Sequence, residues 1–238
     1  MKLIICSKGV RPIQEWVPYG DFETHWILGR DMVDRPGTVH QVVVDHRNPL
    51  AFKHQWAQDN LVRDGEQYLT MDDNVTGLTH LSPQWAEADR EDRNRDIAVE
   101  EPMDIHTVLG IIKGRGAFIG VSCNDNPFYR KIAWSRKATV IGKFMLVTKD
   151  GLRWVPEDAP PFFCQSDKYR SLQVIQRYGR TAVYNWARAV FERSQPGGWG
   201  DQADIVGSRQ RDRALMTDWF LDHFPDVCYE YKDKVRIR

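Results

Sequence analysis

The stretch "AFKHQWAQDNLVRDGEQYLTMDDNV", residues 51–75, decides the fold of this chain. Phe52 and Trp56 lie four residues apart, as residues on one face of a helix do, and Asp64-Gly65 then ends the segment. This pattern predicts a helix within residues 48–66. The short apolar run "QYLTM" that follows predicts a buried strand. A helix that leads into such a strand is part of a parallel α/β unit.

The rest of the chain continues this alternation of strands and helices. Apolar, β-branched and aromatic runs predict further strands at residues 2–7, 24–29, 39–46, 117–123, 142–148 and 181–190. Periodic apolar patterns predict further helices at residues 104–116, 165–180 and 211–224. In the helix at 165–180, Ser166 is the expected N-cap and Gly179 the expected end. We therefore expect an α/β fold with a mixed, mainly parallel central sheet flanked by helices.

Composition and charge limit the class of protein. The chain has 238 residues, 42% of them hydrophobic, with 9 Trp, 8 Tyr and 10 Phe, as in folded globular proteins. Lys and Arg number 33, as do Asp and Glu, so any basic face must be local. No stretch approaches the roughly 18–20 apolar residues of a membrane span, and the N-terminus becomes polar too soon for a signal peptide. Four cysteines without CxxC spacing fit reduced thiols, so we expect a cytoplasmic protein.

Residues 83–103 are densely charged with both signs and contain little apolar material. Mixed charge of this kind is typical of a solvated helix or a surface excursion. We therefore expect an insertion that separates residues 1–82 from residues 104–238.

Asp72, Asp73 and Asn74 directly follow the strand predicted at residues 67–71, and two interpretations are open. They satisfy backbone groups of an Asx turn that Gly77 closes, or they form a cation site at the carboxyl edge of the sheet. Mg²⁺ and Mn²⁺ take one or two protein carboxylates and leave their other positions to water and phosphate. Paired acids at a strand end therefore suit a metal that bridges a nucleotide diphosphate.

Two other predicted strands end in polar residues at the same edge. These ends are Ser7-Lys8-Gly9 and Asp45-His46. Ligands of parallel α/β sheets collect beyond the carboxyl ends of the strands, so the convergence favours a ligand site over a simple turn. The chain has neither a GxxxxGK[ST] loop nor a GxGxxG motif, which argues against P-loop phosphoryl transfer and against the usual dinucleotide site.

Asp167 and the Asn-rich segment at residues 124–126 are further candidates, each with a structural alternative. Asp167 lies in the first turn of a predicted helix, where the helix dipole alone favours an acid, or it is a general base. Asn124, Asp125 and Asn126 precede a proline, so they form an Asn-Pro turn or line a ligand pocket.

The C-terminal part carries candidates for nucleic-acid contact. The Gly-rich segment 192–202 contains Trp199, which suits a lid or an aromatic platform for an extruded base. Segment 207–213, with Arg209 and Arg211, and segment 232–238 concentrate positive charge that could meet phosphates. Each basic segment could equally be a solvated face.

Five segments, taken in order, carry a resemblance to a known family. They are "SKGVRP" (7–12), "VVVDH" (42–46), residues 51–75, "GVSCNDNPFYR" (120–130) and "CQSDKYRSLQVIQRYG" (164–179). Together they resemble GT-A type nucleotide-sugar glycosyltransferases, and among these the phage enzymes that attach sugars to hydroxymethylpyrimidines in DNA, a group related to glycosyltransferases associated with base dioxygenases. The resemblance spans roughly 1–82 and 104–200. The chain departs from the family at His54-Gln55, where the family has Arg-Asn, and at Asn74, where it has a third Asp.

The resemblance implies a single GT-A-like (Rossmann-like) domain, with residues 1–82 as the nucleotide-binding half and residues 104–238 as the acceptor-binding half with a C-terminal helix. It implies a nucleotide-sugar donor, a uridine diphosphate (UDP) sugar, and double-stranded DNA with modified pyrimidines as acceptor, without membrane or obligate protein partner. It implies Asp167 as the catalytic base and a divalent metal, Mn²⁺ or Mg²⁺, held by Asp72, Asp73 and Asn74. The donor-binding residues would be Ser7, Lys8, Arg11, Asp45 and Asp72. The acceptor-binding residues would be Asn124, Asp125, Asn126, Trp199, Arg209 and Arg211.

Three alternatives remain open at this point. The first is a GT-A transferase with a glycan or lipid acceptor, and the second is a nucleotidyltransferase that uses the same acids. The third is a non-catalytic nucleic-acid-binding module. Only the DNA-modifying enzyme predicts both donor binding and salt-dependent binding of duplex DNA.

Overall fold

The computed structural model describes residues 1–7, 11–29, 33–46, 49–88, 98–130, 133–192, 203–231 and 234–238. Its strands are β1 (Lys2–Cys6), β2 (Glu23–Leu28), β3 (Thr38–Gln41), β4 (Gln67–Asp72), β5 (Val75–Leu81), β6 (Glu100–Pro102), β7 (Phe118–Ser122), β8 (Trp134–Ser135), β9 (Phe144–Thr148), β10 (Ala182–Phe191), β11 (Cys228–Glu230) and β12 (Val235–Ile237). Its helices are α1 (Pro49–Leu61), α2 (Pro83–Glu87), α3 (Ile105–Ile112), α4 (Ser166–Tyr178) and α5 (Ala203–His223), with short 3-10 turns at Tyr19–Asp21 and Pro127–Tyr129.

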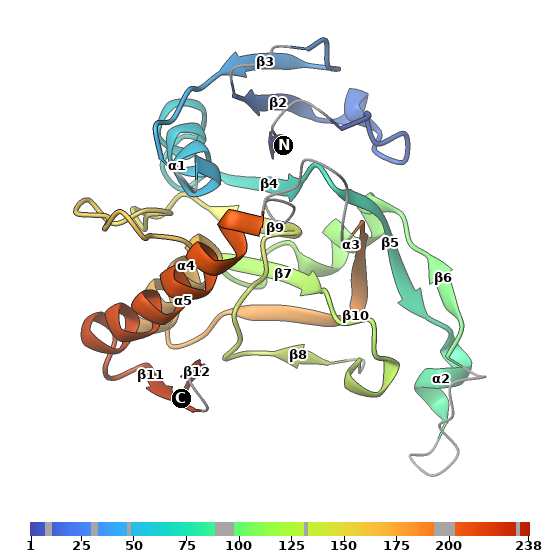
Figure 1. Cartoon of the computed structure of the whole chain (residues 1–238). Coiled ribbons are helices and arrows are strands. Elements are labelled where there is room, and N and C mark those ends of the chain that lie inside the picture. Colours follow the sequence, from blue (N-terminus) through green and yellow to red (C-terminus); the bar gives the residue numbers. More distant parts are fainter. Residues whose placement is uncertain are drawn as a thin grey trace.

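One ten-stranded sheet organises the described chain, in the order β3-β2-β1-β4-β9-β7-β10-β5-β6, with β8 paired to β10 (Figure 1). β1, β2, β3 and β4 are parallel, and β9 runs antiparallel to both β4 and β7. β7 and β10 therefore point the same way as β1, as does β6. Among the described strands, seven of ten share one direction, which confirms the mixed, mainly parallel sheet.

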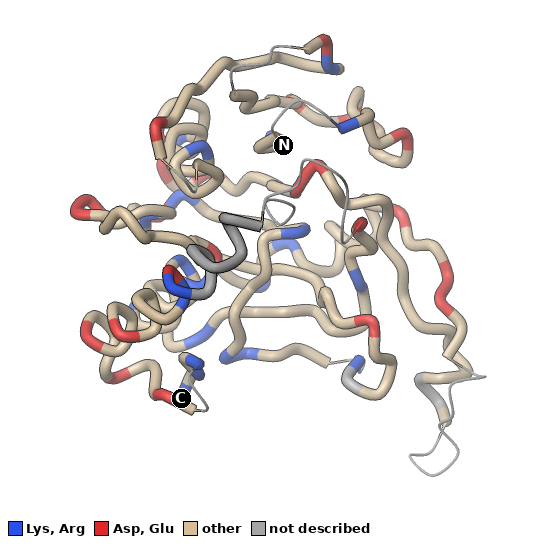
Figure 2. The backbone as a smooth tube through the Cα atoms, in the orientation of Figure 1, with Lys and Arg blue, Asp and Glu red and all other residues tan. Residues whose placement is uncertain are grey.

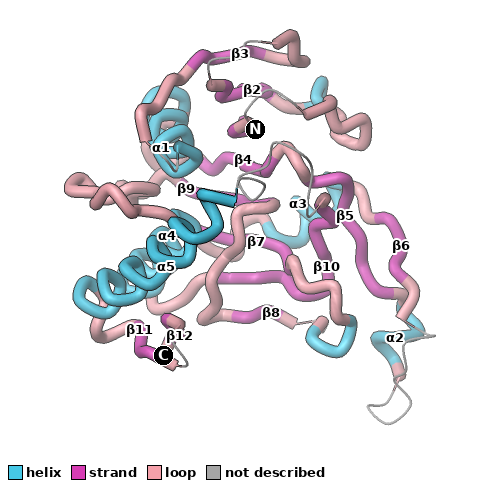
Figure 3. Tube along the Cα trace, viewed as in Figure 1, coloured by secondary structure: helices cyan, strands magenta, loops and turns pink. Residues whose placement is uncertain are grey.

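Helices cover both faces of this sheet, and each face has its own apolar core (Figure 3). In β1, Ile4 belongs to the core that includes residues of α1, α4 and α5, while its neighbours Leu3 and Ile5 belong to the core on the other face, which includes residues of α3. This alternation follows from the two-residue period of a strand. Because both faces are covered, β1 is buried along its whole length, as its apolar sequence predicts. Of the helices that the structure describes, none is both long and apolar enough to cross a membrane.

The segment predicted as a charged insertion, residues 83–103, is less solvated than its composition indicates. Trp85, in α2, is 1% exposed, and Glu100, in β6, belongs to the main sheet. The carboxylate of Glu100 pairs with Arg130 at 2.5 Å and with Arg188 at 2.8 Å. The charges that indicated a solvated segment are thus partly satisfied by partners far away in sequence. Residues 89–97 lie outside the described residues.

Three local predictions are also corrected. Gly77 does not close a bend, because it lies inside β5, a strand that the sequence did not predict. Ser166 is the first residue of α4, and the N-cap is Gln165, which has a left-handed φ of 78°. Gly179 ends α4 as predicted, with φ 75°. The C-terminal helix begins at Ala203, eight residues before the predicted start at 211.

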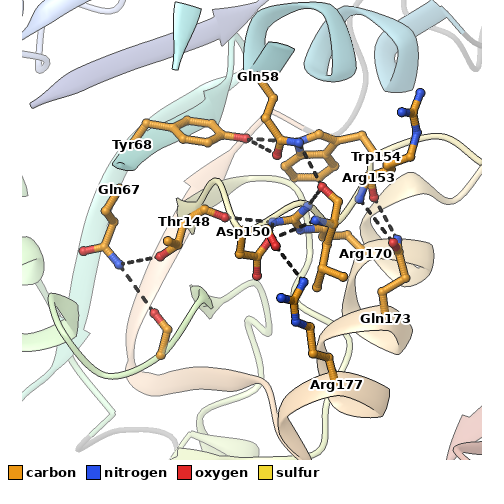
Figure 4. A network of polar contacts seen from close by, with 12 residues as sticks. Gln58, Gln67, Tyr68, Thr148, Asp150, Arg153, Trp154, Arg170, Gln173 and Arg177 are labelled. Carbon is orange, nitrogen blue, oxygen red and sulfur yellow. Dashed lines mark hydrogen bonds and ion pairs between the residues drawn. The ribbon is translucent and has the colours of Figure 1, made fainter. Parts of the chain in front are cut away.

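A buried polar network fixes α4 to the loop after β9 (Figure 4). The guanidinium of Arg170 is fully buried and donates to the Asp150 carboxylate at 2.7 Å and to the Thr148 carbonyl at 2.8 Å. It also donates to the carbonyl of Leu152. Nearby, the indole N–H of Trp154 donates to the Tyr68 hydroxyl at 3.0 Å. The network thereby holds the helix that carries Asp167 in a fixed position against the sheet.

Candidate active site at the carboxyl edge of the sheet

Several strand ends meet at one edge of the sheet. Cys6, the last residue of β1, is in register with Asp72 at the end of β4, and Met71 is in register with Phe144 at the start of β9. Because β9 is antiparallel, its beginning lies beside the ends of β4 and β7. The Asp72 N–H donates to the Lys143 carbonyl at 3.2 Å. This edge therefore gathers the residues that follow β1 and β4 with Lys143, which precedes β9.

Asp73 joins the loop after β1 to the turn after β4. The Ser7 hydroxyl donates to its carboxylate at 2.5 Å, and Arg11 Nε lies 3.8 Å from the other carboxylate oxygen. The Gln14 side-chain amide donates to the Asp73 carbonyl. Burial raises the pKa of Asp73 above its ordinary value, while the Ser7 hydrogen bond and the charge of Arg11 oppose that rise. Ser7, Arg11 and Asp73 are thus brought together at this edge.

Asp72 and Asn74 share a partner that the sequence did not predict. Lys143 Nζ donates to Asp72 Oδ2 at 2.6 Å and to Asn74 Oδ1 at 3.0 Å. The same ammonium lies 4.9 Å from the centre of the Phe191 ring. The side-chain amide of Asn74 donates to the Glu192 carbonyl at 3.2 Å, which ties the turn to the end of β10. We call Asp72, Asp73 and Asn74 the acidic turn, and Figure 2 shows it directly after β4.

A cavity of about 360 Å³ opens beside this turn. Arg11, Asp73 and Asn74 line it together with Trp16 and Glu192. Its volume falls within the range of small-molecule sites in proteins. Arg11 Nη1 is buried and has no hydrogen-bond acceptor among the described residues. Among the lining residues, Arg11 supplies the positive charge, and Glu15, Asp73 and Glu192 supply the acidic groups.

Asp167, in the first turn of α4, faces the same edge. The backbone N–H of Lys168 donates to its carboxylate at 2.9 Å. Burial raises the pKa of Asp167, the backbone N–H groups of Lys168 and Gly142 and the charge of Lys168 lower it, and the negative charge of Asp72 adds to the rise. Asp72, Asp167 and Lys143 all act electrostatically on Cys123, which follows β7. The candidate base therefore belongs to the same group of residues as the acidic turn.

The Asn-rich segment after β7 is used locally. The Asn124 side-chain oxygen accepts from the Asn126 N–H at 3.0 Å, and that of Asn126 accepts from the Phe128 N–H at 3.1 Å. Both are the Asx contacts expected of an Asn-Pro turn. Asn124 and Asp125 are exposed at the edge where β7 ends. Their predicted role in acceptor binding stays a prediction.

The remaining predicted residues make no described hydrogen bond or ion pair with this group, or lie outside the described residues. Asp45 is exposed and lies four residues beyond the end of β3, which is shorter than predicted. Arg211 is exposed on α5. Lys8, Trp199 and the side chain of Arg209 lie outside the described residues.

His54-Gln55, where the chain departs from the family it resembles, serves the core. The His54 ring stacks on Trp154 with ring centres 4.8 Å apart, and its Nδ1 lies 3.4 Å from the thiol of Cys6. Burial lowers the pKa of His54 to about 4, so the ring is neutral at physiological pH. The Gln55 side-chain oxygen accepts from the backbone N–H of Trp154 at 2.7 Å.

The three predicted metal ligands do not fit a divalent metal in this arrangement. Asp72 and Asn74 already share the ammonium of Lys143, and Asp73 is engaged by Ser7 and Arg11. In the described part of the chain, no group of three or more His, Cys, Asp or Glu side chains is placed to hold a metal ion. Lys143 was not predicted, because only the antiparallel course of β9 brings it to the acidic turn.

The comparisons with known proteins concern the fold. No protein-family model matches the chain, and no curated protein sequence matches it. Residues 1–349 of S. aureus TarS, crystallised in complex with UDP, match its structure with a TM-score of 0.50 and 8% identity, over 94% of this chain and 71% of that chain. Apo UDP-glucose pyrophosphorylase matches with a TM-score of 0.44 and 10% identity, over 92% of this chain and 98% of that chain. The synthase of 4-diphosphocytidyl-2C-methyl-D-erythritol from Anaerococcus prevotii matches with a TM-score of 0.36 and 11% identity, over 88% and 94%.

At such low identity, a structural match shows the fold alone. The likeness to TarS, which spans nearly the whole chain, agrees with a GT-A-like (Rossmann-like) α/β domain. The order of the sheet and the position of the acidic turn after β4 are the features of this chain on which that description rests.

Proposed function

We propose that this chain is a glycosyltransferase that moves a sugar from a UDP-sugar to a hydroxyl group of its acceptor. The observation that carries the proposal is Arg11, which lines a cavity at the carboxyl edge of the sheet beside the acidic turn and whose Nη1 has no acceptor among the described residues. A nucleoside diphosphate combines an anion that suits this guanidinium with a flat base that suits a partly apolar cavity. The solved structure with a TM-score of 0.50 was crystallised with UDP, which supports the choice of nucleotide.

The donor would lie along the ends of β1 and β4. The diphosphate would meet Arg11, and Asp73, which accepts a hydrogen bond from Ser7, would hold the guanidinium in place. As the bond between the sugar and the diphosphate breaks, negative charge builds up on the leaving phosphate. Fixed positive groups at that point stabilise it without reorganisation.

The acceptor hydroxyl must lose a proton when its oxygen attacks the anomeric carbon. Asp167 would take that proton, because its carboxylate lies in the same group of residues as Asp72 and its raised pKa improves it as a base. The new bond joins the acceptor oxygen to the sugar, the bond to the diphosphate breaks, and the proton ends on Asp167. This arrangement corresponds to an inverting transferase.

For the acceptor we propose a 5-hydroxymethylpyrimidine in double-stranded DNA, such as phage DNA. The support is the resemblance of the ordered segments to phage DNA glycosyltransferases and the exposed Arg211 on α5. A base inside a duplex would have to be extruded before its hydroxyl could reach the edge of the sheet.

A transfer assay tests this proposal. Purified protein is incubated with UDP-glucose, UDP-galactose or UDP-N-acetylglucosamine and with duplexes that carry hydroxymethylcytosine, hydroxymethyluracil or the unmodified base. The expected result is one duplex whose mass rises by a single sugar residue, with transfer that weakens as salt increases. Release of UDP without any modified duplex would contradict the DNA acceptor, and duplex binding without UDP release would contradict the enzyme.

A further inference from the structure

We propose that Lys143 is the cation of the acidic turn, so that the donor diphosphate is bound by Lys143 and Arg11 without a divalent metal. This inference rests on the proposed function, because it concerns the same donor site. It starts from the disagreement between the metal that the acidic turn suggests and the side chains that surround that turn.

The first argument is position. Lys143 Nζ lies 2.6 Å from Asp72 Oδ2 and 3.0 Å from Asn74 Oδ1, so it occupies the space between the oxygens that a metal would need. A divalent ion at that place would have to displace the ammonium. The ammonium is close to Phe191 as well, and it is shielded, with 19% of the side chain exposed.

The second argument is charge. Asp72 and Asp73 carry two negative charges if both are ionised, and Lys143 and Arg11 carry two positive charges at 2.6 Å and 3.8 Å from them. Each carboxylate of the turn therefore already has a cation beside it, which weakens the attraction that these carboxylates would exert on a divalent ion.

The third argument is the remaining capacity of the ammonium. A lysine ammonium has three N–H donors, and two of them are used by Asp72 and Asn74. The third can donate to a phosphate oxygen without loss of the first two. The backbone around it is held, because the Asp72 N–H donates to the Lys143 carbonyl at 3.2 Å and the Lys143 N–H donates to the Ile141 carbonyl at 2.7 Å. The positive charge is thus fixed before a ligand arrives.

Calorimetric titration of UDP tests the inference on three proteins, each in EDTA and in Mn²⁺. They are the wild type, Lys143→Met and a matched control, Lys149→Met. Lys149 follows the far end of β9 and is 17% exposed, close to the 19% of Lys143, but it pairs with Asp64 and the Val62 carbonyl. Melting temperatures of the two variants show whether each is folded at the titration temperature.

The expected result is a wild-type dissociation constant for UDP that is equal in EDTA and in Mn²⁺ within about twofold, and at least about tenfold weaker binding to Lys143→Met but not to Lys149→Met. Wild-type binding that requires Mn²⁺ would overturn the inference and leave the proposed function standing. Equal binding to wild type and folded Lys143→Met would overturn it as well. No UDP binding in either buffer would refute the proposed donor itself. The wild-type comparison decides between metal and lysine even if Lys143→Met does not fold.

Discussion

Asp167→Asn is expected to lower the rate of sugar transfer by about 10²–10⁴-fold, the usual contribution of a general base. The asparagine side chain keeps the size of the carboxylate but cannot accept the proton of the acceptor hydroxyl. Donor binding should stay the same, because Asp167 is proposed to act on the acceptor. The measurement is single-turnover transfer together with the dissociation constant of UDP. Asp158→Asn, an exposed acid in the loop before α4, is the control that should leave both unchanged.

The raised pKa of Asp167 makes a second readout possible. The base is active only when ionised, so the rate of transfer by the wild type should fall as the pH is lowered. Because the pKa of Asp167 is raised, this fall should occur above the pKa of about 3.9 that an unperturbed aspartate has. The contribution of Asp167 to the free energy of unfolding depends on pH in the opposite direction to the transfer rate. A carboxyl whose pKa is raised in the folded state favours folding when protonated, and that contribution is lost as pH rises through the folded pKa.

Asp167→Asn removes the cost of holding a buried charge, so at neutral pH the variant should be at least as stable as the wild type. A variant that is less stable but transfers sugar at the wild-type rate would show that Asp167 serves only the first turn of α4.

Arg170→Met is expected to lower the free energy of unfolding by about 3–5 kcal/mol, as when one partner of a buried ion pair is removed. The change deletes the donors to Thr148 and Leu152 and leaves the Asp150 carboxylate, whose side chain is 8% exposed, without its strongest partner. Figure 4 shows that the guanidinium lies at the centre of the network between the loop after β9 and α4. Urea denaturation measures the loss.

Arg177→Met is the matched control for this change. Arg177 is exposed and donates to the Asp150 carbonyl at 2.6 Å, so its loss should cost no more than about 1 kcal/mol. The double variant Arg170→Met/Asp150→Asn should recover part of the stability, because the unpaired carboxylate is gone. Equal losses for Arg170→Met and Arg177→Met would contradict the importance of the buried pair.

Local patterns were sufficient to predict much of the fold. The helix that became α1 and the strand that became β4 were predicted from apolar spacing, and the acidic turn after β4 from its residue types. β5 was missed because Gly77 indicated a bend, although the strand is held by pairing with β10, more than a hundred residues later. The charges of residues 83–103 predicted a solvated segment, although Glu100 pairs with Arg130 and Arg188, which are also distant in sequence. Pairing over such distances leaves no local pattern.

The candidate site was predicted in part, for a related reason. Ser7, Arg11, Asp72 and Asp73 follow strands, and the rule that ligands bind at the carboxyl ends of parallel strands brings them together. Lys143 precedes a strand, so the same rule places it at the opposite edge. Only the antiparallel direction of β9 moves it beside Asp72. A sequence does not show which strand in a mainly parallel sheet is reversed.

The binding of UDP to the cavity beside Arg11 is the most direct test of the proposed donor site. Thermal unfolding is measured with and without UDP for the wild type, for Arg11→Ala and for Arg153→Ala, a partly exposed arginine in the loop before α4. At a concentration of 100 times the dissociation constant, UDP should stabilise the wild type and Arg153→Ala by about 2.7 kcal/mol, and Arg11→Ala should lose most of this gain. No stabilisation of the wild type by UDP or any UDP-sugar, while duplex DNA alone stabilises it, would contradict the glycosyltransferase and favour a nucleic-acid-binding protein.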